Sequence, residues 1–166
     1  MPDRLELPAS PFWTFTLAVY QKEGVSPACI ALQDRHGCDV NLVLYACWVG
    51  LSGRGRLTAA DLAQAESTNA PWRGSVIERL RAARRALREE DRTGPVLELY
   101  EAAKAAELAA ERIAQRRLQL LAPTDPARPE GERATDAAAN LRLYLGGRGA
   151  EETAAPIFAA IGAASG

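Results

Sequence analysis

Apolar residues recur along the chain at the three- and four-residue spacing of α-helices, and capping residues precede most of the apolar runs. A serine followed by proline, which suits the start of a helix, occurs at residues 10–11 and again at 26–27. Asp39 can cap a third helix, and Thr58, with an aspartate three residues later, can cap a fourth. Pro71 can open a fifth helix that extends to Leu87.

The longest predicted helix spans residues 94–121 and ends before Pro123. Its apolar residues, beginning with Val96 and Leu99, follow approximately one stripe of the helix surface, and no segment alternates convincingly as a strand does. The chain is therefore predicted to be all-α, with a bundle of five or six main helices over residues 11–122. The residues expected in its core are Trp13, Phe15, Leu17, Ile30, Leu44, Trp48, Ile77, Leu80 and Leu87.

The composition changes after residue 122, because residues 123–131 contain three prolines and a glycine but no large apolar residue. We expect a helical bundle domain over residues 1–122, a mobile Pro-rich linker over 123–134 and an Ala-rich helical tail over 135–166. Thr135 or Asp136 can cap a short helix that ends near Leu145, and a second, weak helix covers 151–163. This tail is expected to dock loosely on the bundle or to contact another chain.

The charge balance limits the classes of partner. The chain carries 20 basic and 21 acidic residues, and nearly all of the basic residues are arginine. This balance argues against a strongly basic nucleic-acid-binding protein. The first six residues are too charged for a signal peptide, and the longest apolar run is about half of the roughly twenty residues that a membrane span needs. Three cysteines form no disulfide framework and fit a reducing compartment, so the protein is expected in the cytoplasm.

Polar residues gather at the predicted junction between the second and third helices. They are Gln33, Asp34, Asp39 and Asn41. Side chains of this kind next to the free N–H groups of a helix start can line a ligand pocket. The alternative interpretation is that they only cap the third helix and satisfy the turn that precedes it.

A second candidate surface is a set of arginines on the fifth predicted helix: Arg81, Arg84, Arg85 and Arg88, with Arg92 beyond them. Steps of three and four residues place most of them on one stripe, and guanidinium groups suit carboxylates and phosphates. The alternative is a solvated face with local ion pairs to Glu78, Glu89, Glu90 and Asp91. These interleaved acids favour an acidic protein segment over duplex nucleic acid as the partner of this surface.

Other patterns are weaker. Cys29, His36, Cys38 and Cys47 lack the close pairs of ligands that zinc sites use. Cys38 precedes a helix start, which favours a reactive thiol, but the sequence identifies no base to accompany it. The glycine-rich residues 50–56 lack the order of a phosphate-binding loop. We therefore predict no metal ion, no cofactor and no catalytic residue.

Asp34 and Asp39 also invite comparison with the aspartate pairs of helical isoprenoid synthases. Their spacing of five residues across a glycine does not place them on one helix face, and a second such pair is absent from the sequence. An enzyme of that class is not predicted.

Two blocks of sequence resemble a family of small uncharacterised bacterial proteins. The first block contains Phe12-Trp13, Leu32-Gln33-Asp34 and Gly37-x-Asp39-Val40-Asn41-Leu42-x-Leu44, followed by Trp48. The second contains Trp72-Arg73 and Leu80-Arg81-x-x-Arg84-Arg85-x-Leu87. The resemblance covers about residues 11–90. It implies a helical domain of unknown function and supplies no activity, cofactor or catalytic residue.

Two functions follow as hypotheses. The preferred one is a non-enzymatic helical module that binds a partner protein through the arginine stripe or the long helix, because no motif assembles a nucleophile, a base and a charge stabiliser. The alternative is a small-molecule-binding or enzymatic bundle with a pocket near Gln33, Asp34, Asp39 and Asn41. Convergence of these four side chains on one cavity would favour the alternative. The sequence leaves the oligomeric state open.

Overall fold

The computed structural model describes residues 8–124 and 127–163 of the chain. The regular elements of these residues are helices, with no β-strand among them, which confirms the all-α prediction. The elements are α1 (Pro11–Tyr20), α2 (Val25–His36), α3 (Val40–Leu51), α4 (Ala59–Trp72), a π-helical segment η1 (Arg73–Ile77), α5 (Glu78–Arg88), α6 (Gly94–Leu121), α7 (Glu130–Leu145) and α8 (Ala155–Gly162). No helix among these described residues has the length and hydropathy needed to cross a membrane.

The predicted capping residues position three of the helix starts. The Ser10 hydroxyl accepts a hydrogen bond from the Trp13 N–H, and the Asp39 carboxylate accepts one from the Asn41 N–H. Thr58 and its aspartate form a reciprocal capping box at α4. The start of α2 differs, because Gly24 in the left-handed conformation precedes it and the helix includes the predicted serine cap.

The prediction that Pro71 opens a separate helix is wrong. Pro71 lies inside α4, and the chain continues through η1 into α5 without a break. A proline lacks the N–H that a helix interior needs. The turn after it widens into the π-helical segment, and the Ser75 hydroxyl donates to the Pro71 carbonyl at 2.6 Å.

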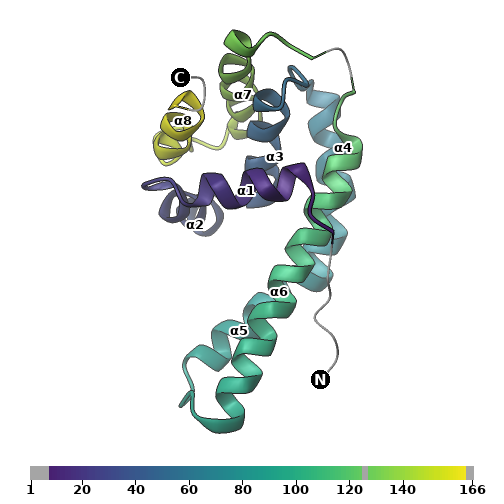
Figure 1. The fold of residues 1–166 in the computed structure, drawn as a ribbon. Helices are drawn as coiled ribbons and strands as arrows, with labels where there is room; N and C mark the ends of the chain where they lie inside the picture. The colour runs from purple at the N-terminus through teal and green to yellow at the C-terminus, as the bar shows by residue number, and fades with distance from the viewer. Residues whose placement is uncertain (1–7, 125–126, 164–166) are drawn as a thin grey trace.

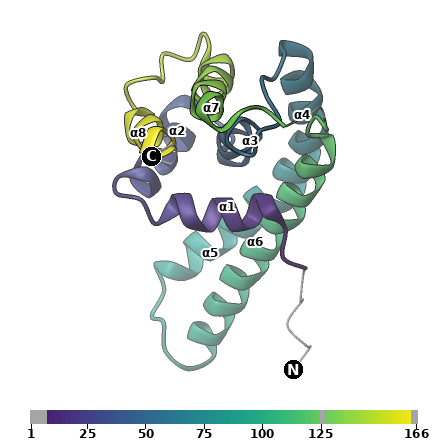
Figure 2. The same ribbon diagram turned by 45° about the horizontal axis from the view of Figure 1, so that its top comes forward.

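Two groups of helices make up the molecule (Figure 1). α5 and the first half of α6 extend as an antiparallel pair away from the other helices, and α1 crosses between this pair and the group that contains α3, α7 and α8 (Figure 2). The centre of that group is α3, whose residues 41–50 are all buried. Phe12 of α1 stacks on Trp48 of α3, with ring centroids 5.1 Å apart.

The predicted core is correct in part. Leu44, Trp48 and Ile77 are buried, whereas Trp13, Phe15, Leu80 and Leu87 are only half-buried. Leu17 and Ile30 are exposed. α1 carries apolar residues on several sides, and Phe12, Thr16 and Val19 form the face that packs inward. This rotation of α1 turns Leu17 away from the core.

The tail packs closely on the other helices, so the expectation that it docks loosely is wrong, whereas its contact with another chain stays a prediction. α7 packs along α3, and its Leu141 and Leu145 belong to the same buried cluster as Trp48. Gly50 of α3 faces the main chain of Ala137, so the two helices approach closely. α8 adds Ile157 and Ile161 to this cluster. α7 also begins at Glu130, inside the segment predicted to be a linker. Small residues at the α3–α7 contact allow this close packing, which weak helical patterning alone does not reveal.

Candidate functional site

A cleft of about 940 Å³ lies between α1, α2 and the start of α3 on one side and η1, α5 and α6 on the other. It is lined by all eight candidate residues, which the sequence placed in two separate sites: Gln33, Asp34, Asp39, Asn41, Arg81, Arg84, Arg85 and Arg88. The fold brings the two sets together, because α5 stands opposite α2 across the cleft.

The floor of the cleft is a strip of polar residues on α6. Glu107, Glu111 and Gln115 follow one another at four-residue steps and all line the cleft. Sequence reasoning missed Glu107 and Gln115. Their spacing is the one signal that could have indicated their burial. They lie on the same helical face as Ala110 and Ala114, which are buried.

Arg81 and Arg84, the inner arginines, hold α5 to this strip. Arg81 donates to Glu107 and to Glu111, each at 3.0 Å, and Arg84 donates to Glu107 at 2.5 Å. Arg81 also donates to Gln33 Oε1 at 2.8 Å, which ties α5 to α2 across the cleft. Burial raises the pKa of Glu107, but the hydrogen bonds from the two arginines outweigh it and hold the pKa below its usual value. The guanidinium groups of the inner arginines are therefore occupied by carboxylates of the protein itself.

Arg85 and Arg88, the outer arginines, are held less firmly. Their side chains are 49% and 56% exposed, and their ion pairs with Asp34 and Glu89 are 3.6 and 3.5 Å long. Exposed pairs of this kind contribute at most about 1 kcal/mol. The predicted local ion pair on α5 is present between Arg88 and Glu89. Because both outer arginines are about half exposed, they remain accessible from the cleft and its rim.

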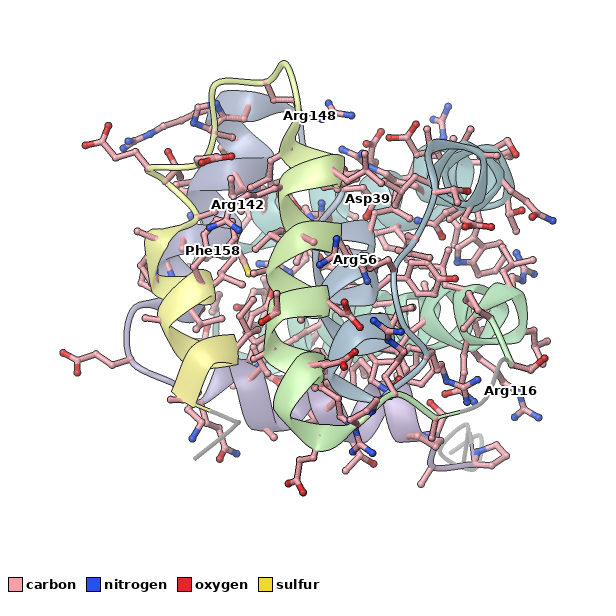
Figure 3. All side chains as sticks on the ribbon, turned by 90° about the horizontal axis from the view of Figure 1, so that it is seen from above. Asp39, Arg56, Arg116, Arg142, Arg148 and Phe158 are labelled. Atoms are coloured by element: carbon pink, nitrogen blue, oxygen red, sulfur yellow. The ribbon has the colours of Figure 1, made fainter. Side chains whose placement is uncertain are left out.

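Asp39 is a helix cap and also lines the cleft. Besides the Asn41 N–H, its carboxylate accepts a hydrogen bond from Asn69 of α4 at 2.6 Å, and its own N–H donates to the Tyr144 hydroxyl of α7 at 2.8 Å. Figure 3 shows Asp39 between α4 and α7. The capping interpretation therefore holds for Asp39, whose carboxylate is satisfied by the protein. Gln33 and Asp34 instead pair with arginines across the cleft.

Apolar side chains also line the cleft. Leu17 of α1 and Ile30 of α2 lie on one side and Leu108 of α6 on the other, and all three are exposed to solvent. Trp13 is half-buried beside them. Exposed apolar side chains that gather around a hollow are typical of sites that bind ligands or proteins.

The remaining candidates of the sequence lie elsewhere. Cys29, Cys38 and Cys47 are buried free cysteines. Burial raises the pKa of the Cys38 thiol above its usual value and that of Cys29 to about 11, which disfavours a reactive thiolate. His36 forms a hydrogen bond with the Thr153 hydroxyl at 3.0 Å. Within residues 8–124 and 127–163, no three His, Cys, Asp or Glu side chains are grouped as a metal site would require.

The glycine-rich loop after α3 serves the packing of α7. Gly53 and Gly55 have positive φ angles, and their main chain faces Arg133 and Arg128 near the start of α7. The main chain of this loop also receives hydrogen bonds, since the Gly53 carbonyl accepts from the Arg128 N–H and the Gly55 carbonyl from Asn140. The loop thus connects two helices at a close contact.

Comparison with known proteins identifies the family. A family model described as "Protein of unknown function (DUF2390)" matches residues 11–118, so the chain belongs to that family. The resemblance noted in the sequence is thereby confirmed. No curated protein and no solved structure matches the chain. All residues that line the cleft fall within the matched range, whereas α7 and α8 lie beyond it.

Proposed function

We propose that the protein is a non-catalytic binding module that takes an acidic, amphipathic segment of a partner protein into the cleft. The observation that carries this proposal is the pairing of exposed apolar side chains with accessible arginines on one hollow surface. Leu17, Ile30 and Leu108 supply the apolar contact. Helical segments bind other proteins by laying such a face into a groove.

The two outer arginines favour an acidic segment that reaches the rim of the cleft. The outer arginines, Arg85 and Arg88, are about half exposed and only weakly paired, so carboxylates of a partner can replace Asp34 and Glu89. The cleft as a whole carries five arginines against five acids: Arg73, Arg81, Arg84, Arg85 and Arg88 against Asp34, Asp39, Glu89, Glu107 and Glu111. This balance gives no net positive field of the kind on which duplex nucleic-acid binding depends.

Binding rather than catalysis is supported by how the inner polar groups are used. Glu107 is engaged by both inner arginines, and Asp39 by Asn69 and by its own helix start. Catalytic acids and bases need to reach a substrate proton. These groups instead hold α5 to α6 and fix the start of α3.

Two observations favour a second candidate, a small molecule. Gln33, Asp34, Asp39 and Asn41 all line the one cleft, and the volume of the cleft suits such a ligand. A volume of about 940 Å³ falls within the range of roughly 300–1,000 Å³ that is typical of small-molecule pockets. A small ligand would occupy the same cleft, so the variants below test both candidates at one surface.

The test is selection of binders from a display library of random peptides, followed by affinity measurement with the synthesised peptides. We expect the selected peptides to be acidic and apolar. Leu17→Asp and the double variant Arg85→Glu/Arg88→Glu should each weaken binding at least about tenfold. The matched controls are Leu120→Asp and Arg116→Glu, which change exposed residues of α6 that do not line the cleft. Arg116 is labelled in Figure 3. The controls should leave affinity within about twofold.

Two results would contradict the proposal. The first is that no peptide binds while a metabolite raises the melting temperature of the wild type but not of Leu17→Asp, which would assign the cleft to a small molecule. The second is that the cleft variants and their controls weaken peptide binding equally. Near-UV circular dichroism of each variant separates loss of binding from loss of folding.

A further inference from the structure

The inner end of the cleft contains buried polar side chains that differ from the charged rim. Thr16 donates its hydroxyl to Gln115 Oε1 at 2.9 Å, and Gln115 donates its amide to Asn41 Oδ1 at 2.9 Å. The oxygen of Asn41 is thus engaged. Its amide nitrogen has no acceptor among the described residues, although Asn41 is only 7% exposed.

The unpartnered nitrogen of Asn41 faces the cleft. Asn41 lines the cleft, and no side-chain nitrogen or oxygen sealed inside the described part of the chain lacks a partner. The nitrogen is therefore reached from the cleft. Buried polar groups in proteins are nearly always hydrogen-bonded, so a buried amide that opens only into a cleft points to an acceptor on the ligand.

Glu111 offers the complementary group. It accepts one hydrogen bond, from Arg81 to its Oε1, and its other oxygen receives none from the described residues. Burial raises the pKa of Glu111, and Arg81 offsets this only in part, in contrast to Glu107 with its two arginines. The Glu111 carboxylate can therefore accept a further hydrogen bond from a ligand.

The two groups line the same part of the cleft. Gln115, which donates to Asn41, lies one helical turn beyond Glu111 on α6, and all three residues line the cleft. An amide group accepts at its oxygen and donates at its nitrogen, so one amide can engage both side chains.

We propose that the inner end of the cleft is a subsite for an amide group of the bound segment, with its carbonyl oxygen on the Asn41 amide and its N–H on the Glu111 carboxylate. The inference rests on the proposed function in so far as the amide belongs to a partner protein. Two sources carry this chemistry, a main-chain peptide bond and the side chain of an asparagine or glutamine.

The first experiment needs no peptide. The full chain, labelled with ¹⁵N, is titrated with N-methylacetamide, and the side-chain amide signals of Asn41 and Asn140 are followed by NMR. Asn140 is the internal control, because its nitrogen donates to the Gly55 carbonyl and its oxygen accepts from the Leu57 N–H. The Asn41 signals should shift several times more than those of Asn140. Methyl acetate, which accepts but cannot donate, should shift them less.

Equal shifts of the Asn41 and Asn140 signals would overturn the subsite. Equal shifts of Asn41 by the amide and the ester would overturn the role of Glu111. Both NMR comparisons can be made whether or not any peptide binds. A failure of the proposed function is therefore distinguished from a failure of the subsite.

The second experiment identifies the source of the amide with a selected peptide. Each peptide bond is replaced in turn by an ester, and each asparagine or glutamine by leucine. One replacement should weaken binding about tenfold, and Asn41→Asp should add little further loss with that peptide. Loss of affinity after an ester replacement identifies a main-chain amide as the bound group. Loss of affinity after a leucine replacement identifies a side-chain amide. A peptide that binds equally well after every replacement and to Asn41→Asp would overturn the subsite while leaving the proposed function intact.

Discussion

Shortening Leu141 to alanine tests whether α7 is part of the core. Leu141 is fully buried in the same cluster as Trp48 of α3. Leu141→Ala removes three carbon atoms, and at about 0.8 kcal/mol for each buried methylene the transfer cost alone is about 2.4 kcal/mol. The cavity left behind adds to this, because tightly packed helices relax only in part. We expect a total loss of about 3–4 kcal/mol in the free energy of unfolding.

The assay is urea-induced unfolding followed by tryptophan fluorescence. Leu143→Ala is the matched control, because Leu143 is on the same helix but 42% exposed. It should cost less than about 1 kcal/mol. In thermal unfolding, Leu141→Ala should lower the melting temperature by roughly 10 °C, at about 2–4 °C for each kcal/mol. Equal, small losses in the two variants would refute the reasoning and would mean that α7 contributes little to the stability of α3.

Further predictions concern the carboxylates of α6 and the α3–α7 contact. Glu107→Gln should lower the free energy of unfolding at pH 7 by about 2–3 kcal/mol in urea titrations, because two arginines lose their charged partner, whereas Glu111→Gln should change it by less than about 1 kcal/mol. The lowered pKa of Glu107 means that its stabilisation is complete above the ordinary glutamate value of about 4.3 and is lost as the pH falls toward the folded-state pKa. The wild type should therefore lose more stability than Glu107→Gln between about pH 5 and pH 3. Gly50→Ala should cost about 2 kcal/mol or more, since the added methyl group overlaps the main chain of Ala137, and Gly162→Ala, with open space around it, should be nearly neutral in the same assay.

Local signals made most of the helix starts predictable. Ser10, Asp39 and Thr58 cap helices through hydrogen bonds to residues two or three positions away. Both partners of each hydrogen bond therefore lie within one short segment of the sequence, where the cap can be recognised. The sequence does not predict which face of α1 packs against the core. α1 carries aromatic and apolar residues on several sides, and Phe12 rather than Leu17 turns inward because Trp48 of another helix receives it.

Eight of the residues that line the cleft could be predicted as candidates from the sequence, but not that they lie together in the fold. Gln33 and Arg81 are 48 positions apart in the chain, and only the packing of α5 opposite α2 lets one donate to the other. Glu107 and Gln115 escaped prediction for another reason. They lie on the face of α6 that otherwise buries alanines, and a helical stripe of small residues reads as core whether or not polar residues interrupt it.

Asp39 lines the cleft and is also hydrogen-bonded to α7. All of the cleft residues lie within residues 11–118, yet the N–H of Asp39 donates to Tyr144, far outside that range. The Asp39 carboxylate in turn receives the N–H of Asn41 and so fixes the first turn of α3. Asn41, whose amide forms part of the proposed subsite, lies in this turn and lines the cleft. α7 therefore supports the start of α3 through Tyr144, and a tail with weak helical patterning helps to position residues of the candidate site without lining it.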